Sequence, residues 1–347
     1  GSMTEGDVAK LRIGAAGLSA LAISVLALAP AAWGRPVSVP PPATGAYSKI
    51  SMPGAAQTSP EGNNDRGTVV GCFRGTTGPQ HAFVERGGTF ARITDPAAGR
   101  RFTCAAAISD TGVIVGDYIG KTGVLHGFVD RSGKYSTVSV PRASQQSGQG
   151  TVAVGINRAG VVVGWYLNPQ GVEYGYILKN GHFTIVSAPG AAQTRTSGTI
   201  LNGIADDGTM SGMYTAGGTE HGFTYRDGVF SPVAVPGALN TLVACISARS
   251  GLVVGAYQRL STSHLVGFTE LGGVFHSLRD PLATLGTIPQ CGNDFGRVVG
   301  FYQTLHFVAH GFLFTPGATA AAITRTGQTG LHVLPPSGLG IRLGEVG

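Results

Sequence analysis

The residues with the clearest capacity for chemistry share one position of a repeated unit. Two residues before an Ile-like position, three copies carry Glu61, Asn202 and Gln290, and the other three carry Ala or Val. Burying such polar groups without partners costs on the order of a few kcal/mol, so they predict bound water, a cation or a polar ligand. Calcium accepts oxygen ligands of this kind, with Glu61 and Asn202 as candidate ligands. The small number of carboxylates favours ordered water over calcium.

These side chains belong to a unit that occurs six times. Its signature is Gly-Val-Val-Gly-x-Tyr or a close variant, and the second glycine recurs every 43 to 48 residues. A His-Gly-Phe-like tripeptide follows each copy. A fixed period of this length, built from strand-like units, is typical of a propeller or a solenoid. The second glycines are Gly71, Gly116, Gly164, Gly212, Gly255 and Gly300.

Each unit contains four runs that predict strands. In the third unit the runs are residues 151–157, 161–166, 174–179 and 182–188, and they are rich in β-branched and aromatic residues. Asn180-Gly181 between the last two runs predicts a two-residue hairpin turn, because such pairs adopt the positive φ angles that this turn requires. The sequence therefore predicts an all-β fold, a six-bladed β-propeller of four-stranded antiparallel blades.

The two ends of the repeat region predict how the ring closes. Five units end their fourth strand in a proline, whereas the last unit has no fourth strand of its own. A matching strand and proline stand at residues 47–53, before the first unit. We predict that this N-terminal strand joins the last blade, because closure removes open sheet edges. The five prolines are Pro96, Pro141, Pro189, Pro236 and Pro281.

Composition divides the chain into four segments. Residues 1–34 combine an expression scar with a secretory signal, because Lys10 and Arg12 precede an apolar run too short for a membrane span. Residues 35–45 are a Pro-rich leader that we expect to be flexible, 46–318 the propeller, and 319–347 a Gly/Ala/Pro-rich tail. We expect a secreted or cell-surface monomer, without a stable membrane span after processing.

Charge is sparse in this chain. Charged residues make up 12% of it, the net charge is +6, and 56 of 347 residues are glycine. The basic residues are scattered singly, so we expect no nucleic-acid binding. Runs of Val, Ile, Tyr and Phe between the glycines indicate packed sheets with tight turns.

The recurring motifs resemble the HAF family of extracellular repeats. The resemblance rests on the His-Gly-Phe tripeptide, the Asn-x-x-Gly turns at 157–160 and 293–296, and the Gly-x-Tyr run, and it covers residues 47 to about 318. It implies secretion and a β-rich repeat array, and it implies no established reaction. Tyr174 and Val266 replace the histidine in two copies. That histidine therefore cannot perform one chemical task in every blade.

The four tripeptide histidines could suggest a metal site. On the third strand of a radial blade they would lie roughly two sheet spacings of about 4.8 Å away from the innermost strand. Histidines placed in this way point outward around the ring and cannot converge on one ion. We therefore expect structural hydrogen bonds from these residues, which are His81, His126, His221 and His310.

The position between Gly and Tyr in the run varies without shared chemistry. Both a pocket wall and a tolerant surface would vary in this way, so the sequence leaves the choice open. The tyrosine beside it recurs in five copies, which favours a packing role between blades. The variable residues are Cys72, Asp117, Trp165, Met213, Ala256 and Phe301.

The four cysteines divide by their places in the unit. Cys72 ends a second strand and Cys104 begins the next inner strand at the same face, so we predict a disulfide between them. Cys245 and Cys291 stand at near-equivalent positions of adjacent inner strands. Such positions are expected to lie too far apart for the Cα separation of about 5.5 Å in a disulfide.

The loops joining fourth to first and second to third strands are the longest, which predicts binding at that face. We expect a secreted propeller that binds a small-molecule or polysaccharide-like ligand at the channel mouth. The alternative is an enzyme in the same cup, either a metal-assisted hydrolase or lactonase, or a cyclase or isomerase that positions its substrate. A structural surface protein is the third hypothesis. The expected ligand-binding residues are Glu61, Asn202, Gln290, Asp117, Trp165 and Arg101.

No nucleophile elbow, phosphate loop or zinc-ligand spacing is present in the sequence. If the protein is an enzyme, its acid or base would come from Glu61, Asp117, His264 or His306. For each of these residues a structural or solvated role is favoured.

Overall fold

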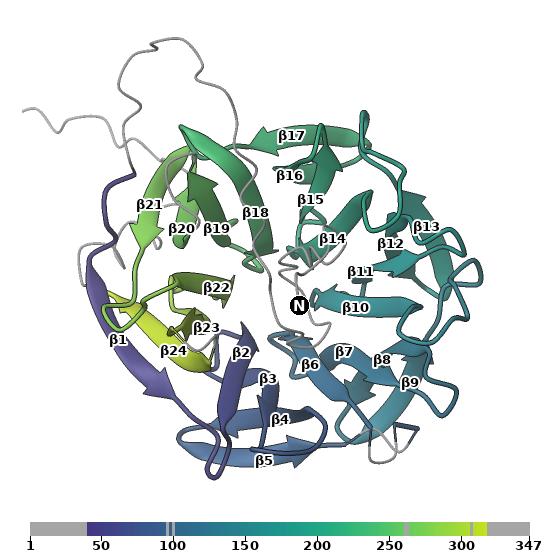
Figure 1. Ribbon diagram of the computed structural model, residues 1–347, viewed down its shortest axis with the longest axis horizontal. Coiled ribbons are helices and arrows are strands. Elements are labelled where there is room, and N and C mark those ends of the chain that lie inside the picture. The colour runs from purple at the N-terminus through teal and green to yellow at the C-terminus, as the bar shows by residue number, and fades with distance from the viewer. Residues whose placement is uncertain (1–39, 95–96, 99–100, 260–263, 306–307, 318–347) are drawn as a thin grey trace, which may run out of the picture.

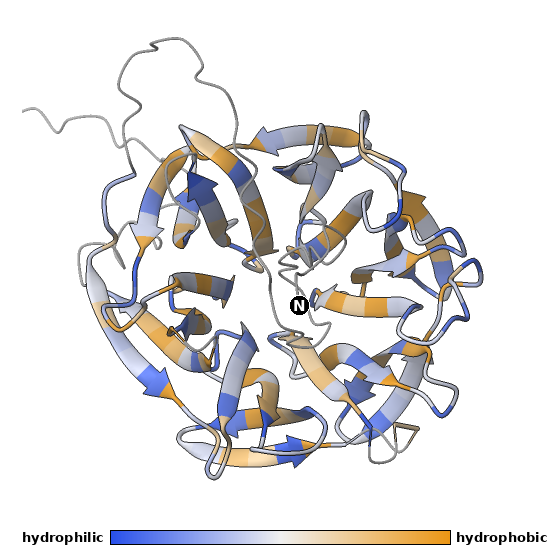
Figure 2. Cartoon of the chain, in the orientation of Figure 1, coloured by the Kyte–Doolittle hydropathy of each residue, from blue (hydrophilic) through white to orange (hydrophobic). Residues whose placement is uncertain are grey.

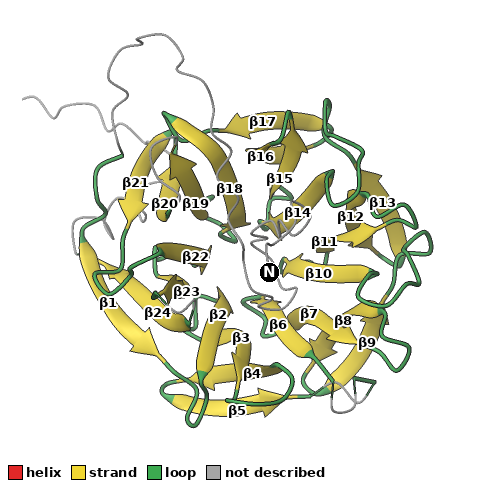
Figure 3. Ribbon diagram, in the orientation of Figure 1, coloured by secondary structure: helices red, strands yellow, loops and turns green. Residues whose placement is uncertain are grey.

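The computed structural model describes residues 40–94, 97–98, 101–259, 264–305 and 308–317. These residues form strands, turns and bends and contain no helix (Figure 3). The strands form four four-stranded sheets and one eight-stranded sheet around a central axis (Figure 1). The eight-stranded sheet consists of two four-stranded parts that a single parallel pair, Leu265 and Gly286, connects, and each four-stranded unit is called a blade below. The prediction of an all-β propeller is confirmed, and the predicted secretory signal and the tail at 319–347 lie outside the described residues.

The third blade shows the unit most clearly. Its strands are β10 (Thr151–Ile156), β11 (Val162–Leu167), β12 (Glu173–Lys179) and β13 (His182–Val186), paired antiparallel in this order. Their bounds agree with the predicted runs to within two residues. Asn180 and Gly181 have φ values of 52° and 80°, as the predicted hairpin requires.

The other blades repeat this order from the axis outward. Blade 1 contains β2 (Gln57–Asn63), β3 (Val69–Arg74), β4 (His81–Arg86) and β5 (Thr89–Ile93). Blade 2 contains β6 (Thr103–Ile108), β7 (Ile114–Ile119), β8 (Leu125–Arg131) and β9 (Lys134–Val138). Blade 4 contains β14 (Thr199–Ile204), β15 (Met210–Ala216), β16 (Thr219–Arg226) and β17 (Val229–Val233). Blade 5 contains β18 (Ala238–Ile246), β19 (Val253–Arg259), β20 (Leu265–Leu271) and β21 (Val274–Leu278).

The last blade takes its outer strand from the N-terminal side of the chain. It contains β22 (Gly286–Gly292), β23 (Val298–Gln303), β24 (Ala309–Pro316) and β1 (Gly45–Ile50). β1 pairs antiparallel with β24, and Figure 1 shows the purple β1 beside the yellow β24. The predicted pairing of the N-terminal strand is confirmed, although the strand begins two residues earlier than predicted. The inner strand β2 contacts both β6 and β22.

The residues before β1 attach to blade 5. Ala43 N donates a hydrogen bond to Ser277 O at 2.9 Å, and Ser277 N donates to Pro41 O at 2.8 Å. Ser277 lies in β21, so one segment of chain contacts the outer strands of two blades. The predicted leader, residues 35–45, stays a prediction, and its residues 35–39 lie outside the described residues.

Every inner strand contains a β-bulge at the same place. In β2 the pairing shifts between Pro60 and Gly62, so Glu61 is the extra residue. A bulge leaves one residue unpaired and bends its strand, which re-aims that side chain. The six bulge residues are Glu61, Ala106, Val154, Asn202, Ala244 and Gln290.

Aromatic pairs account for most of the repeated motif. In blade 2, the rings of Tyr118 and His126 lie 5.4 Å apart on facing residues of β7 and β8, and Phe128 meets Tyr135 at 5.9 Å. Both pairs have equivalents in blades 1, 3, 4 and 6, and blade 5 has the second pair alone, Phe268 with Phe275. Figure 2 shows the resulting mixture of apolar and polar positions along the strands. The motif therefore stabilises each blade, because facing aromatic residues contribute beyond their buried area.

Candidate functional site

The six bulge residues meet at a cavity on the axis, which we call the cup. The cup has a volume of about 70 Å³ and is lined by these residues and by the turns that join inner to second strands. The predicted axial position of Glu61, Asn202 and Gln290 is confirmed. The cup lies on the side of these turns, whereas binding was expected at the opposite loops.

Glu61 is the one acidic residue among the bulge residues. Its Oε1 accepts a hydrogen bond of 2.6 Å from Ser59 Oγ. Burial raises the pKa of Glu61 to about 7, and the bond from Ser59 opposes the shift without cancelling it. At neutral pH this carboxyl group can therefore either donate or accept a proton.

Asn202 and Gln290 are the other polar residues among the six bulge residues. Asn202 Nδ2 donates to Val243 O of the next blade at 2.7 Å, while its Oδ1 is buried without a partner among the described residues. Gln290 is also buried. Ala106, Val154 and Ala244 supply the apolar part. The cup thus offers a hydrogen-bond acceptor beside small apolar walls, which suits a hydroxyl group or water.

Hydrogen bonds between turns link neighbouring blades around the rim of the cup. Asp65 N donates to Asp110 Oδ1 and Asp294 N donates to Asp65 Oδ1, both at 3.0 Å. The Arg249 side chain bonds Asp65 and also Asp294, the latter through Nε at 2.9 Å. Burial and the charge of Asp294 raise the pKa of Asp65 to about 6. Carboxyl oxygens of Asp65, Asp110 and Asp294 lie within 4.8 Å of one another. Because these carboxylates already accept hydrogen bonds from other turns, we assign the cluster a structural function, the connection of blades.

The Asn-x-x-Gly turn has a structural function that the sequence did not reveal. Asn157 Oδ1 accepts from Val161 N at 3.0 Å, and its Nδ2 donates to Ala205 O of the next blade at 3.2 Å. Gly160 adopts a φ of 77°, which favours glycine. Asn64 and Asn293 make the same pair of contacts. One amide therefore fixes its own turn and binds the adjacent blade.

The variable position between Gly and Tyr forms neither a cup wall nor a surface. Five of its six residues belong to one buried apolar cluster, which we call the plug. The plug extends to Leu125, Leu167 and Leu265, at the loops between second and third strands. Asp117 and Trp165 were expected in the cup, but both are buried outside its lining. The cause is register, since Asp117 pairs with Cys104, two residues before the bulge.

The remaining predicted residues lie apart from the cup. Arg101 is exposed in the loop before β6, and His264 is exposed just before β20. His306 lies outside the described residues. Neither Arg101 nor His264 lines the cup.

The tripeptide histidines have local partners, as expected for structural residues. His126 Nδ1 lies 2.9 Å from Ser139 Oγ, and Arg92 Nη2 lies 2.9 Å from His81 Nδ1. Burial lowers the pKa of both histidines. In the described part of the chain, no group of three metal-ligand side chains contains a histidine.

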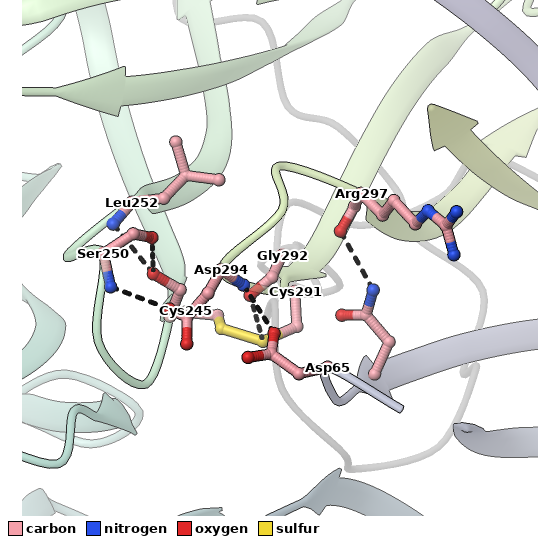
Figure 4. The surroundings of a disulfide bond; sticks show 10 residues. Asp65, Cys245, Ser250, Leu252, Cys291, Gly292, Asp294 and Arg297 are labelled. Atoms are coloured by element: carbon pink, nitrogen blue, oxygen red, sulfur yellow. Dashed lines mark hydrogen bonds between the residues drawn. A yellow bond between two sulfur atoms is a disulfide. The ribbon is translucent and has the colours of Figure 1, made fainter. Parts of the chain in front are cut away.

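Both cysteine pairs form disulfides. Cys72–Cys104 confirms the prediction, with Cα atoms 5.1 Å apart. Cys245–Cys291 is also bonded at 5.1 Å, so its expected wide separation is wrong (Figure 4). Inner strands of neighbouring blades lie close together at the position after the bulge, since a Cβ added at Gly155 would lie 3.1 Å from Gly203 Cα. The residues at this position are Gly62, Ala107, Gly155, Gly203, Cys245 and Cys291, and their small size was a signal in the sequence.

A larger hollow lies between blades 6 and 1, and we call it the groove. Its volume is about 420 Å³, and Lys49, Glu85, Phe90 and Arg297 are among its lining residues. Asn63 and Asn293 line both the groove and the cup, so the two hollows share a wall. Sequence reasoning missed the groove, because it forms where β1 and β24 meet blade 1.

Comparisons with known proteins show the class of fold. No protein-family model and no curated sequence matches the chain. Among solved structures it is similar to TolB from Acinetobacter baumannii, with TM-score 0.51, 10% identity and coverage of 72% of this chain and 63% of that one. It is similar to an Aleuria aurantia lectin mutant in complex with Fucα1-6GlcNAc, with TM-score 0.50, 12% identity and coverage of 76% and 96%. It is also similar to AofleA from Arthrobotrys oligospora, with TM-score 0.50, 11% identity and coverage of 79% of this chain and 87% of that one.

These similarities show a propeller fold, and the resemblance to the HAF family stays a prediction. Two disulfides are consistent with an extracytoplasmic location. Within the described ranges, no helix is long and apolar enough to cross a membrane.

Proposed function

We propose that the protein is a closed, secreted six-bladed propeller that binds carbohydrate across the cup and the groove. The Aleuria aurantia lectin supports the ligand class by its fold and its bound saccharide, although at 12% identity the ligand does not transfer with the fold. The proposal therefore rests on the cup and the groove of this chain.

The shared wall of the two hollows is the main observation. The groove, at about 420 Å³, has the volume of a small-ligand pocket, whereas the cup, at about 70 Å³, admits only a small polar group. A sugar ring would contact Phe90 in the groove, and Arg297 and Glu85 would bond its hydroxyl groups. A neighbouring hydroxyl group would reach the cup past Asn63.

The bulge residues alone do not supply a calcium donor set. Calcium takes six to eight oxygen ligands, but three of the six bulge residues are Ala or Val. Glu61 is the one ionised acid that the bulge positions could supply. We therefore propose that water occupies the cup, and that glycan binding does not need calcium. The other carboxyl groups that line the cup, those of Asp65, Asp110, Asp206 and Asp294, lie in its rim turns and hydrogen-bond neighbouring turns or Arg249, so we do not assign them a catalytic function.

A glycan array probed with the full chain tests this function. We expect binding that persists in a chelator, and an Arg297→Ala variant about tenfold weaker for the same glycan. Arg66→Ala is the matched control, because Arg66 is also an exposed arginine of this turn face but lines neither hollow. Equal binding by Arg297→Ala and Arg66→Ala, or no glycan bound by the unaltered protein, would contradict the proposal.

A further inference from the structure

Two carboxyl groups and a disulfide meet between blades 1 and 2. A carboxyl oxygen of Glu61 and the Sγ atoms of Cys72 and Cys104 lie within 4.8 Å of one another. Asp117 stands directly opposite Cys104 in the β6–β7 register. Glu61, Cys72 and Cys104 come from β2, β3 and β6, and Asp117 stands beside Cys104 on β7, outside this group of three.

Asp117 has no structural explanation in the oxidised protein. It is fully buried, and neither of its carboxyl oxygens has a hydrogen-bond partner among the described residues. Its register partner Cys104 belongs to the apolar plug. Burial, and then the charge of Glu61, raise its pKa well above the usual range. Burying an acid without a hydrogen-bond partner is costly. The neutral disulfide supplies no positive charge that could stabilise Asp117 and Glu61 together.

We propose that reduction of the Cys72–Cys104 disulfide converts this pocket into a zinc site. Zn²⁺ would be bound by Cys72 Sγ, Cys104 Sγ and a Glu61 oxygen, and Asp117, opposite Cys104, would turn toward the ion as the fourth ligand. Zinc prefers four ligands and accepts thiolate and carboxylate together, at about 2.3 Å and about 2.0–2.2 Å. A cation also removes the mutual repulsion of the two acids.

The chemistry balances with a phosphine as the reductant. Phosphorus attacks one sulfur, the S–S bond breaks, and water supplies the oxygen of the phosphine oxide. The two hydrogens of that water end on the two sulfurs as thiols. Zn²⁺ then displaces both thiol protons, and each sulfur keeps the electron pair that binds the metal.

The chain contains its own control. Cys245–Cys291 has the same Cα separation of 5.1 Å and also joins neighbouring blades. Among the described residues it belongs to no group of three metal-ligand side chains. Replacing either pair by alanine removes one disulfide and leaves the other, and Ala107 shows that alanine fits the inner-strand position of Cys245 and Cys291.

The experiment compares the two double variants in full-length form, reduced with a phosphine without oxygen and dialysed against Zn²⁺. Cys245→Ala/Cys291→Ala retains the proposed site and should bind one zinc ion per chain, with a higher Tm. Cys72→Ala/Cys104→Ala should bind none. Equal zinc content in both variants, zinc in neither, or equally tight binding by the oxidised protein would overturn the proposal.

Cobalt and two further variants test the ligands individually. Co²⁺ bound to the reduced, site-retaining variant should give a thiolate-to-cobalt charge-transfer band. Glu61→Gln and Asp117→Asn in that variant should each weaken zinc binding at least about tenfold. Unchanged affinity in both would overturn the site. If the reduced variant unfolds, recovery of its β-sheet circular dichroism on adding Zn²⁺ supports the site, and failure to recover contradicts it.

Discussion

At the scale of single residues, Glu61 shows how one bulge changes a side chain. The bulge aims Glu61 at the cup, and burial there raises its pKa to about 7. The folded protein therefore keeps this proton at pH values where the unfolded chain, with an ordinary value of 4.5, has released it. Each pKa unit corresponds to about 1.4 kcal/mol.

The sign of this shift predicts a pH-dependent stability. Between pH 4.5 and 7 the folded state binds more protons than the unfolded state, so Glu61 lowers the free energy of unfolding as pH rises through that window. The unaltered protein should lose on the order of 2 kcal/mol of unfolding free energy between pH 5 and pH 8 through Glu61. Glu61→Gln should not show this loss. Urea unfolding at the two pH values measures it.

The control for this prediction is Glu270→Gln, since Glu270 lies on a hairpin and bonds Gly273 N. This variant should follow the pH dependence of the unaltered protein. A Glu61→Gln protein that loses stability from pH 5 to pH 8 as steeply as the unaltered protein would show that the carboxyl group is well solvated.

Residue-level prediction succeeded where the copies of the repeat could be compared. Glu61, Asn202 and Gln290 were located on the axis because the same position recurs in every copy. Asp117 and Trp165 were assigned to the cup because their position varies, but a plug with unequal neighbours also tolerates variation. Side-chain direction depends on register, and the bulge that sets the register leaves no clear mark in the sequence.

At the scale of elements, the close approach of inner strands is the main constraint. A Cβ added at Gly203 would lie 2.8 Å from Ile246 N and 3.2 Å from Cys245 Cα. Backbone atoms of a central strand cannot move away as the end of a flexible side chain can. The position after the bulge therefore accepts glycine, alanine or a cysteine in a disulfide.

This constraint predicts a destabilised variant. Gly203→Ala should lower the free energy of unfolding by about 1–3 kcal/mol, since extra atoms in a packed core force the backbone apart. Gly75→Ala is the control, because an added Cβ there lies 3.5 Å from its nearest neighbour, Thr77 O. Denaturant unfolding measures both variants. Equal stability of the two would mean that the inner strands can separate at no cost.

At the scale of the whole molecule, closure depends on segments far apart in the sequence. The strands and hairpins were predicted locally, and the missing fourth strand indicated the pairing of β1 with β24. The groove and the bonds from Asp294 to Asp65 could not be predicted in this way. They arise only when the first and last blades meet, and their residues are separated by most of the chain.

Closure gives the last prediction. Removing residues 40–50 should expose the edge of β24 and uncover Phe312 and Phe314, whose rings contact Tyr47 at 5.5 Å and 5.1 Å. We expect a lower Tm and aggregation through the open edge. A peptide of residues 40–53 added in trans should restore the Tm, because it supplies the same backbone bonds and the same aromatic ring. The same peptide with Tyr47 replaced by alanine should restore less. If the truncated chain stays as stable as the full one, β1 is dispensable and the contacts of β2 with β22, β23 and β24 are enough to join the first and last blades.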